Sequence, residues 1–270
     1  MISNQILQST IEGLKGIARI DLCVLDAEGK ILASTFKEQE DFEGVVGPFI
    51  DSPADSQVIR GHQFFKVYDE TQLEYILVAN GGSDDVYMVG KIAAFQIQNL
   101  LVAYKERFDK DNFVKNLLLD NLLLVDIYNR AKKLHIPTDV KRVVFIIETV
   151  REKENNVMES VRAMFGVKSR DFITAVDEKN VIVVKELLLS DTYEELVKIA
   201  KTMRDTLSAE GIKGVHIAYG TIVGEIKDVS RSYKEAKMAL DVGRIFFEDR
   251  DIIAYSALGI GRLIYQLPIP

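Results

Sequence analysis

The amino-acid sequence predicts an α+β protein built from two domains and a helical linker. The first observation is the order helix, two strands, irregular segment, two strands and helix over residues 1–104. The second is the order strand, helix, two strands, helix, strand, helix and strand over residues 139–270. The third is helical apolar spacing without a strand pattern over residues 105–138, which we therefore predict to be the linker.

The elements of the first domain are predicted from apolar periodicity and turn residues. Ile6, Leu7 and Ile11 recur at helical steps, and Gly29 can take a positive φ at the end of a turn. The expected elements are a helix over 3–18, strands over 19–25 and 30–36, an irregular acidic segment over 37–63 with room for a short helix, strands over 64–69 and 74–80, and a helix from residue 86. A small antiparallel sheet with helices on one side satisfies this order. It is the pattern of PAS- and GAF-type sensory domains, in which the irregular segment covers a pocket.

The helix that begins near Val86 is predicted to leave the first domain and to mediate dimerisation. Ile97, Leu101, Tyr104 and Phe108 follow a 4-3-4 spacing, which is typical of a coiled-coil seam. The sequence therefore predicts a homodimer with paired helices over 86–108. The alternative is that the same stripe packs against its own domain.

The second domain alternates short strands with amphipathic helices. The expected elements are strands over 143–148, 172–176, 181–185, 215–220 and 251–255, and helices over 154–164, 193–207 and 229–246. The order strand, helix, strand, strand, helix, strand is that of ferredoxin-like and cyclase-like domains.

Composition predicts a cytoplasmic protein without direct contact to DNA or membrane. The formal net charge is -7 and no dense block of lysine and arginine occurs, whereas DNA binding depends on neutralising phosphates. No apolar run reaches the ~18–20 residues that span a bilayer. The single cysteine, Cys23, lies in an apolar strand, where we expect a buried structural thiol.

Motifs in the second half of the chain resemble one protein family. The residues that carry the resemblance are Tyr219-Gly220, Ser232-Tyr233-Lys234-Glu235-Ala236, Ala239-Leu240, Tyr255 and Leu258-Gly259. They resemble the end of the GGDEF-like domain of the sugar diacid regulators, the CdaR or PucR-type family of transcription factors. The linker resembles that of the same family through Arg107, Phe113, Leu117, Leu118, Ala131, Lys132 and Leu134. Asp26, Gly29, Ile31, Ala33 and Ser34 resemble the start of its diacid-recognition domain, so the resemblance covers roughly residues 1–268.

The resemblance implies the sensing and dimerising part of a cytoplasmic bacterial transcription regulator. Its members continue into a C-terminal helix-turn-helix, whereas this chain stops at Pro270. DNA contact is therefore expected only through a helix-turn-helix that this chain lacks. The implied ligand is a small carboxylated metabolite such as a sugar diacid.

A carboxylated ligand needs cationic hydrogen-bond donors, ideally arginine. Arg60 and His62 lie in the irregular segment, and Lys66 lies on the strand that follows it. We therefore select Arg60, His62 and Lys66 as candidate ligand-binding residues. The alternative is that they are ordinary surface charges, and the many acidic residues nearby weaken an anion pocket.

An enzymatic function is the least favoured interpretation. Diguanylate cyclases share the topology of the second domain, but they need acidic ligands for two metal ions and a Gly-Gly hairpin close to the nucleotide. Glu148 can stand in for one metal ligand and Asp177 or Glu178 for another, but the hairpin Val176–Asn180 contains no glycine. The sequence therefore predicts a degenerate, non-catalytic GGDEF-like domain with no cofactor and no metal. A scaffold that binds only protein, without a metabolite, remains the main competing function.

Overall fold

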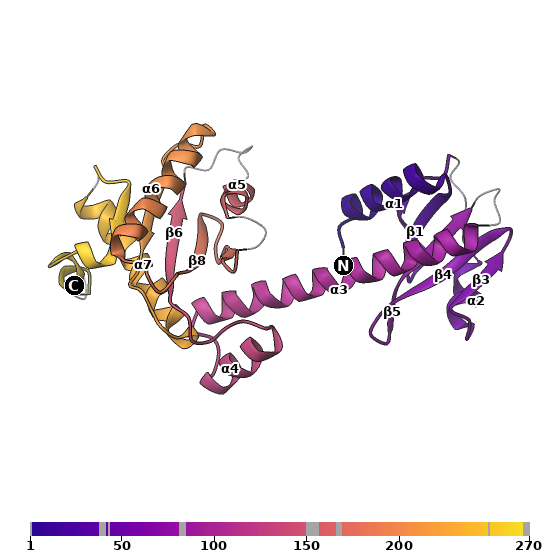
Figure 1. The fold of residues 1–270 in the computed structure, drawn as a ribbon, viewed down its shortest axis with the longest axis horizontal. Helices are drawn as coiled ribbons and strands as arrows, with labels where there is room; N and C mark the ends of the chain where they lie inside the picture. Colours follow the sequence, from indigo (N-terminus) through magenta and orange to yellow (C-terminus); the bar gives the residue numbers. More distant parts are fainter. Residues whose placement is uncertain are drawn as a thin grey trace. The chain divides into compact units, whose positions relative to one another are not determined.

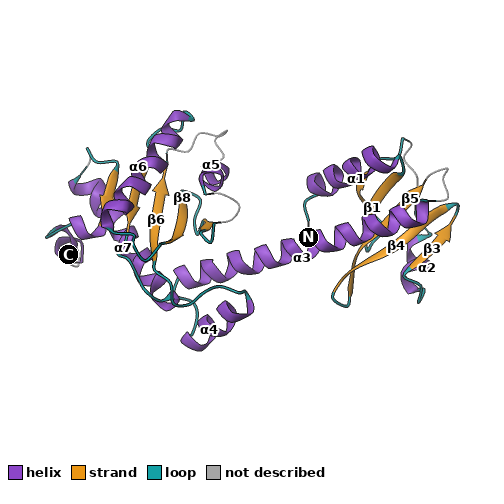
Figure 2. Ribbon diagram, in the orientation of Figure 1, coloured by secondary structure: helices purple, strands orange, loops and turns teal. Residues whose placement is uncertain are grey.

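The computed structural model describes residues 2–37, 42, 44–80, 85–149, 157–165, 169–247 and 249–266. The chain divides into two compact units, Met1–Phe108 and Asp109–Pro270. Figure 1 traces the chain through both units, and Figure 2 shows that each contains its own sheet. The predicted α+β class is confirmed.

Unit 1 is built on an antiparallel five-stranded sheet with the strand order β2-β1-β5-β4-β3. Its elements are α1 (Asn4–Ala18), β1 (Asp21–Asp26), β2 (Ile31–Ser34), α2 (Val46–Asp51), β3 (Ser56–Ile59), β4 (His62–Asp69), β5 (Gln72–Asn80) and the first part of α3 (Val86–Leu118). The segment 37–63 contains the short helix that was expected there, α2, and an additional edge strand, β3, that was not expected. Assignment of this unit to the PAS or GAF type stays a prediction.

The two faces of this sheet bury two separate cores. Because side chains alternate along a strand, Leu22 and Val24 of β1 point to one face while Cys23 and Leu25 point to the other. Helices α1 and α3 cover the first face, and α2 covers the second. The expectation that helices pack on one side only is therefore wrong for α2. The expected burial of Cys23 is confirmed.

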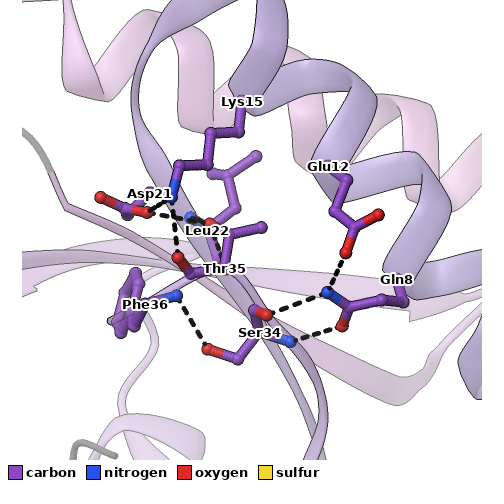
Figure 3. Close-up of polar contacts among 8 residues, drawn as sticks. All are labelled: Gln8, Glu12, Lys15, Asp21, Leu22, Ser34, Thr35 and Phe36. Atoms are coloured by element: carbon purple, nitrogen blue, oxygen red, sulfur yellow. Dashed lines mark hydrogen bonds and ion pairs between the residues drawn. The ribbon is translucent and has the colours of Figure 1, made fainter. Parts of the chain in front are cut away.

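Side-chain hydrogen bonds connect helix α1 to the edge strand β2 (Figure 3). The Ser34 N–H donates to Oε1 of Gln8, and Gln8 Nε2 donates to the Ser34 carbonyl, each over 3.0 Å. Two turns further along α1, Lys15 Nζ donates to the Thr35 carbonyl over 2.9 Å and pairs with Asp21. These contacts satisfy polar groups at the end of an edge strand and hold α1 over the first core.

Helix α3 packs onto unit 1 through the residues that were predicted to form a dimer seam. Ile97 and Leu101 are buried in the core beneath α1 and α3, and Tyr104 packs against the same core. Gly90 allows close approach, since a Cβ there would lie 2.2 Å from Cε2 of Phe65. The predicted coiled-coil stripe is therefore wrong, because its centre is occupied by the helix's own sheet.

One described helix, α3, is long and apolar enough to cross a membrane by length and composition. An 18-residue window within it has a mean hydropathy of 1.3, and 28% of that window is buried. One such helix is weak evidence of a membrane span, so the expectation that no apolar segment spans a bilayer stays a prediction. Part of the apolar character has a local cause, because Ala93, Ile97 and Leu101 belong to the core of unit 1.

Unit 2 is built on a second five-stranded sheet with the order β10-β9-β6-β8-β7, in which only the β9–β10 pair is parallel among the described strands. Its elements after α3 are α4 (Leu124–Lys133), β6 (Arg142–Glu148), α5 (Val157–Met164), β7 (Phe172–Thr174), β8 (Asn180–Glu186), α6 (Tyr193–Ala209), β9 (His216–Tyr219), η1 (Ile226–Asp228), α7 (Val229–Phe246), β10 (Ile252–Ala254), η2 (Tyr255–Ala257) and α8 (Gly261–Gln266). The expected start of the helix over 154–164 lies outside the described residues.

The sheet of unit 2 also separates two cores. One core lies against α7, α4 and the end of α3, and the other lies against α5 and α6. Phe113, Leu117 and Ala131, from the predicted linker over 105–138, belong to the first of these cores. The last turns of α3 and the whole of α4 are thus an integral part of unit 2.

Candidate functional site

The cyclase-like position of unit 2 lies at one end of its central strand, β6. Glu148 closes β6, and the strand register places it opposite Asn180 of β8 on one side and His216 of β9 on the other. The β7–β8 hairpin therefore turns at the same end of the sheet as Glu148. This is the arrangement that the sequence predicted for a cyclase-like site.

The side chain of Arg244 forms an ion pair with the carboxylate of Glu148. The guanidinium of Arg244, on α7, donates through Nε to Oε2 over 3.0 Å and through Nη2 to Oε1. Such bidentate pairing is among the stronger charge-assisted contacts in proteins. The side chain of Glu148 is only 17% exposed, so both of its oxygens are directed at a protein partner. The carboxylate that resembles a metal ligand is therefore neutralised by the chain itself.

Asp177, the second candidate ligand, is used to close its own hairpin. Its Oδ1 accepts hydrogen bonds from the backbone N–H groups of Lys179 and Asn180, each over 2.9 Å. Burial raises the pKa of this carboxyl, but hydrogen bonds from Asn180 and Lys179 together outweigh that effect and leave the pKa lowered. An ionised Asp177 thus stabilises a turn built without glycine. Glu178 is exposed on the same turn.

The described residues contain no group of three or more His, Cys, Asp and Glu side chains that could hold a metal ion. Two-metal chemistry requires several carboxylates around a shared position. At this end of the sheet, the carboxylates of Asp177 and Glu148 are each directed at nitrogen donors of the chain.

A cavity of about 160 Å³ adjoins the Glu148–Arg244 pair, between α7 and the strands β9 and β10. Its lining residues are His216, Ile217, Leu240, Gly243, Arg244, Phe247, Arg250 and Ile253. Three of these side chains are basic or can carry positive charge, and the Arg250 guanidinium lies 5.1 Å from the centre of the Phe247 ring. Sequence reasoning missed this site because its cationic residues come from β9, from α7 and from the loop that follows α7. No local spacing signals that they meet.

The ligand-binding residues predicted in unit 1 occupy three different environments. Arg60 is exposed in the β3–β4 turn with a positive φ of 51°. His62 lies against the rings of Phe36 and Phe42, at centroid distances of 5.7 and 6.0 Å. The prediction that these residues bind a ligand stays a prediction.

Lys66 has a structural role at the end of α2. Its Nζ donates to the carbonyls of Ile50 and Ser52, and it lies 5.2 Å from the centre of the Phe49 ring. A cation at a helix C-terminus satisfies carbonyls that have no partner within the helix. The Lys66 ammonium is therefore directed at α2, while Arg60 lies in the exposed turn before β4.

Comparison with known proteins identifies part of unit 2. The family model of the GGDEF-like domain matches residues 121–242. No curated protein matches the chain. Among solved structures, PelD 156–455 from Pseudomonas aeruginosa PA14 in complex with c-di-GMP is 10% identical, with 82% of each chain covered and a TM-score of 0.30. The apo form of the same protein is 12% identical, with 92% of this chain and 90% of that chain covered and a TM-score of 0.29. These TM-scores are too low to show a common fold. The match to the family model identifies residues 121–242 of unit 2 as a GGDEF-like domain.

Proposed function

We propose that the GGDEF-like unit is a non-catalytic module of a regulatory protein, which acts by binding other protein surfaces. The observation that carries the proposal is the pairing of Glu148 with Arg244. A divalent ion at this position would have to displace a bidentate guanidinium from a carboxylate that is mostly buried. Displacement would also leave the cation of Arg244 beside the metal ion, where like charges repel.

The hairpin supports the same proposal. A glycine-free turn places side chains where a nucleotide would need to approach the backbone closely. In this chain the turn is held by Asp177, whose carboxylate is engaged with Lys179 and Asn180. The polar groups of this turn are thus bonded to one another, which does not favour binding of a phosphate or a metal ion.

Nucleotide turnover tests the proposal directly. The full chain would be incubated with GTP and Mg²⁺ or Mn²⁺, beside the variants Arg244→Ala and Glu148→Ala. We expect no product from any of the three, because removing Arg244 frees one carboxylate without restoring the hairpin. Product made by the unmodified chain, lost in Glu148→Ala and kept in the control Glu159→Ala, would overturn the proposal. Glu159 is an exposed glutamate on α5, so its substitution controls for a change in charge alone.

The regulatory process that we propose is transcription, in the cytoplasm, by analogy with the sugar diacid regulators that the motifs resemble. The full sequence has an acidic balance, with a formal net charge of -7. Contact with DNA would therefore come through another polypeptide segment. In this scheme unit 2 transmits a state to that segment through protein contacts.

Sensing of a carboxylated metabolite is the second function that we propose, and the cavity in unit 2 favours it. His216 and Arg250 line this cavity beside Arg244, which is paired with Glu148, whereas Arg60 and Lys66 in unit 1 lie in different environments. A ligand carboxylate needs convergent donors of this kind. The apolar lining from Leu240, Phe247 and Ile253 would contact the carbon skeleton of the ligand.

A thermal-shift panel distinguishes the two proposed functions. Sugar acids, dicarboxylates, GTP and cyclic di-GMP would be added to the full chain. A ligand at a hundredfold excess over its dissociation constant adds about 2.7 kcal/mol, which corresponds to a rise in Tm of about 5–10 °C. A shift lost in Arg250→Ala assigns the ligand to the cavity of unit 2, and one lost in Arg60→Ala assigns it to unit 1. No shift with any compound supports the protein-binding module alone.

A further inference from the structure

Helix α3 is apolar on two opposite faces within unit 1. One face carries Ala93, Ile97 and Leu101, which are buried against the sheet. A helix that is apolar all round is normally buried on all sides. In α3, however, the face opposite the sheet is exposed in the described part of the chain. Packing within unit 1 therefore does not explain the apolar side chains on that face.

The exposed face has the spacing of a coiled-coil seam. Met88, Ile92, Phe95 and Val102 are 65%, 56%, 65% and 57% exposed. With the exposed Asn99 they form a 4-3-4-3 series, which we name the exposed stripe: Met88, Ile92, Phe95, Asn99 and Val102. In heptad terms Ile92 and Asn99 occupy a positions, while Met88, Phe95 and Val102 occupy d positions.

We propose that the exposed stripe pairs in parallel with the exposed stripe of a second copy of this chain. The argument for a second copy is self-complementarity, because each a or d residue in a parallel pair meets its own counterpart. Asn99 decides the orientation. In the parallel pair Asn99 meets Asn99 and can form a hydrogen bond across the interface, whereas an antiparallel pair sets it against an apolar d residue.

The charges around the stripe define the length of the contact. Asp85 and Glu106 occupy the a positions one heptad before Ile92 and one heptad after Asn99. A parallel pair would bring each of these acids close to its own counterpart, so the seam ends between them. The positions that flank the seam bring no like charges together. They are Lys91, Gln96 and Gln98, and Lys91 would face the uncharged Gln96 of the second copy.

The strength of the pairing follows from its size. The stripe from Met88 to Val102 is about 21 Å long at 1.5 Å per residue. Five side chains per copy bury less than the roughly 800 Å² per partner of a standard interface. We therefore expect a reversible dimer that dissociates in the micromolar range. The inference is independent of the function proposed for unit 2, because every residue in the stripe belongs to unit 1.

Disulfide trapping tests the pairing and its direction in the full chain. Met88→Cys and Val102→Cys place a thiol at d positions, and the native Cys23 is buried. We expect each variant to form a homotypic disulfide dimer under mild oxidation, with no mixed 88–102 product when the two variants are combined. Val58→Cys is the control, because Val58 is 64% exposed on the edge strand β3 and lies outside the stripe. Mixed 88–102 products in place of the homotypic ones, or equally fast trapping of Val58→Cys, would overturn the proposal.

Sedimentation measures the same contact without cysteine. We expect the unmodified chain to shift from monomer to dimer with rising concentration, Phe95→Glu to remain monomeric and Val58→Glu to behave as the unmodified chain. Circular dichroism would confirm that Phe95→Glu remains folded, as expected for a side chain that is 65% exposed. A chain that remains monomeric at submillimolar concentration, or a dimer that Phe95→Glu leaves unchanged, contradicts the proposal. Monomers that instead bind phosphatidylglycerol vesicles, and lose that binding in Phe95→Glu, would assign the stripe to a lipid surface and overturn it as well.

Discussion

Gln8 and Ser34 exchange two hydrogen bonds through which a helix side chain takes the place of a neighbouring strand (Figure 3). The amide of Gln8 both accepts from the Ser34 N–H and donates to the Ser34 carbonyl. Its Nε2 also donates to Glu12 over 2.8 Å, which fixes the orientation of the amide. The outer edge of β2 is therefore satisfied at Ser34 without a further strand.

We predict that Gln8→Ala weakens the contact of α1 with β2 by about 1–2 kcal/mol, because two hydrogen bonds to a partly buried backbone are lost. Hydrogen exchange would show faster exchange over residues 31–36. The control is Ser9→Ala, since the Ser9 hydroxyl bonds only the exposed Ile6 carbonyl among the described contacts of its side chain. Equal exchange in the two variants would contradict the role of Gln8.

Gly220 and Ser232 pack so closely that a side chain at position 220 cannot be accommodated. A Cβ on Gly220 would lie 2.1 Å from the backbone oxygen of Ser232 and 2.7 Å from its Oγ. That Oγ accepts from the Val144 N–H and donates to the Thr221 carbonyl, so it is fixed by both neighbours. Helix α7 is therefore joined to β6 and to the end of β9 at this point.

We predict that Gly220→Ala destabilises unit 2 by about 3 kcal/mol through overpacking. Gly224→Ala is the matched control, because a Cβ there meets nothing within 4 Å. It should change stability by less than about 0.5–1 kcal/mol. Thermal unfolding of both variants checks the prediction, and a comparable loss in Gly224→Ala would show that the close approach to Ser232 is not the cause.

The sequence predicted those features that depend on local periodicity. The second-domain strand and helix order and the hairpins were recovered because apolar alternation and turn residues are local signals. Tyr219-Gly220 and Ser232-Tyr233, which carried the family resemblance, mark the contact between β9 and α7 just described. The predicted seam on α3 was wrong for a physical reason. Periodicity shows that a helix has an apolar face, but α3 has two, and only the fold decides which of them meets the sheet.

The position of the candidate site was predictable from the sequence, but the pairing of its carboxylate with an arginine was not. Glu148 was selected from its place at the end of a strand, and the structure puts it at the hairpin end of β6. Its partner Arg244 comes from α7, far along the chain, so no local sequence pattern predicts this ion pair. Lys66 was selected for its charge, whereas the fold uses that charge at the end of α2.

Arg142 is a buried cation that depends on Glu186. The side chain of Arg142 is 1% exposed, its Nη2 donates to the Pro137 carbonyl over 2.7 Å, and it lies 3.6 Å from the Glu186 carboxylate. Burial lowers the pKa of this guanidinium, and the charge of Glu186 opposes that effect. Glu186 therefore compensates a charge that has been withdrawn from water.

We predict that Glu186→Leu costs about 3–5 kcal/mol, because it leaves the buried guanidinium uncompensated. Adding Arg142→Met should recover most of that loss, since the charge is then gone. Arg170→Ala is the control: Arg170 also lies 3.6 Å from Glu186, but it is 69% exposed and should matter by less than about 1 kcal/mol. A double-mutant cycle by urea unfolding measures the coupling. Additive losses in the double variant would contradict the prediction.

Tyr219 makes the stability of unit 2 sensitive to alkaline pH. Its side chain is 3% exposed and packs on Phe145 at a centroid distance of 5.3 Å. Burial raises the pKa of the Tyr219 phenol, and the charge of Tyr193 adds to that rise. The folded state thus favours the neutral phenol, whose pKa in the unfolded chain is about 10. The contribution of this group is intact below that pH and is lost as the pH rises through the higher folded pKa.

We predict that Tyr219→Phe moves the midpoint of alkaline unfolding to higher pH, because the substituted ring has no proton to lose. Circular dichroism between about pH 8 and pH 12 follows the transition. Tyr87→Phe is the control, since it removes the same hydroxyl from a tyrosine that is 48% exposed. Identical alkaline midpoints for the unmodified chain and Tyr219→Phe would mean that ionisation of this buried phenol does not drive the loss of structure.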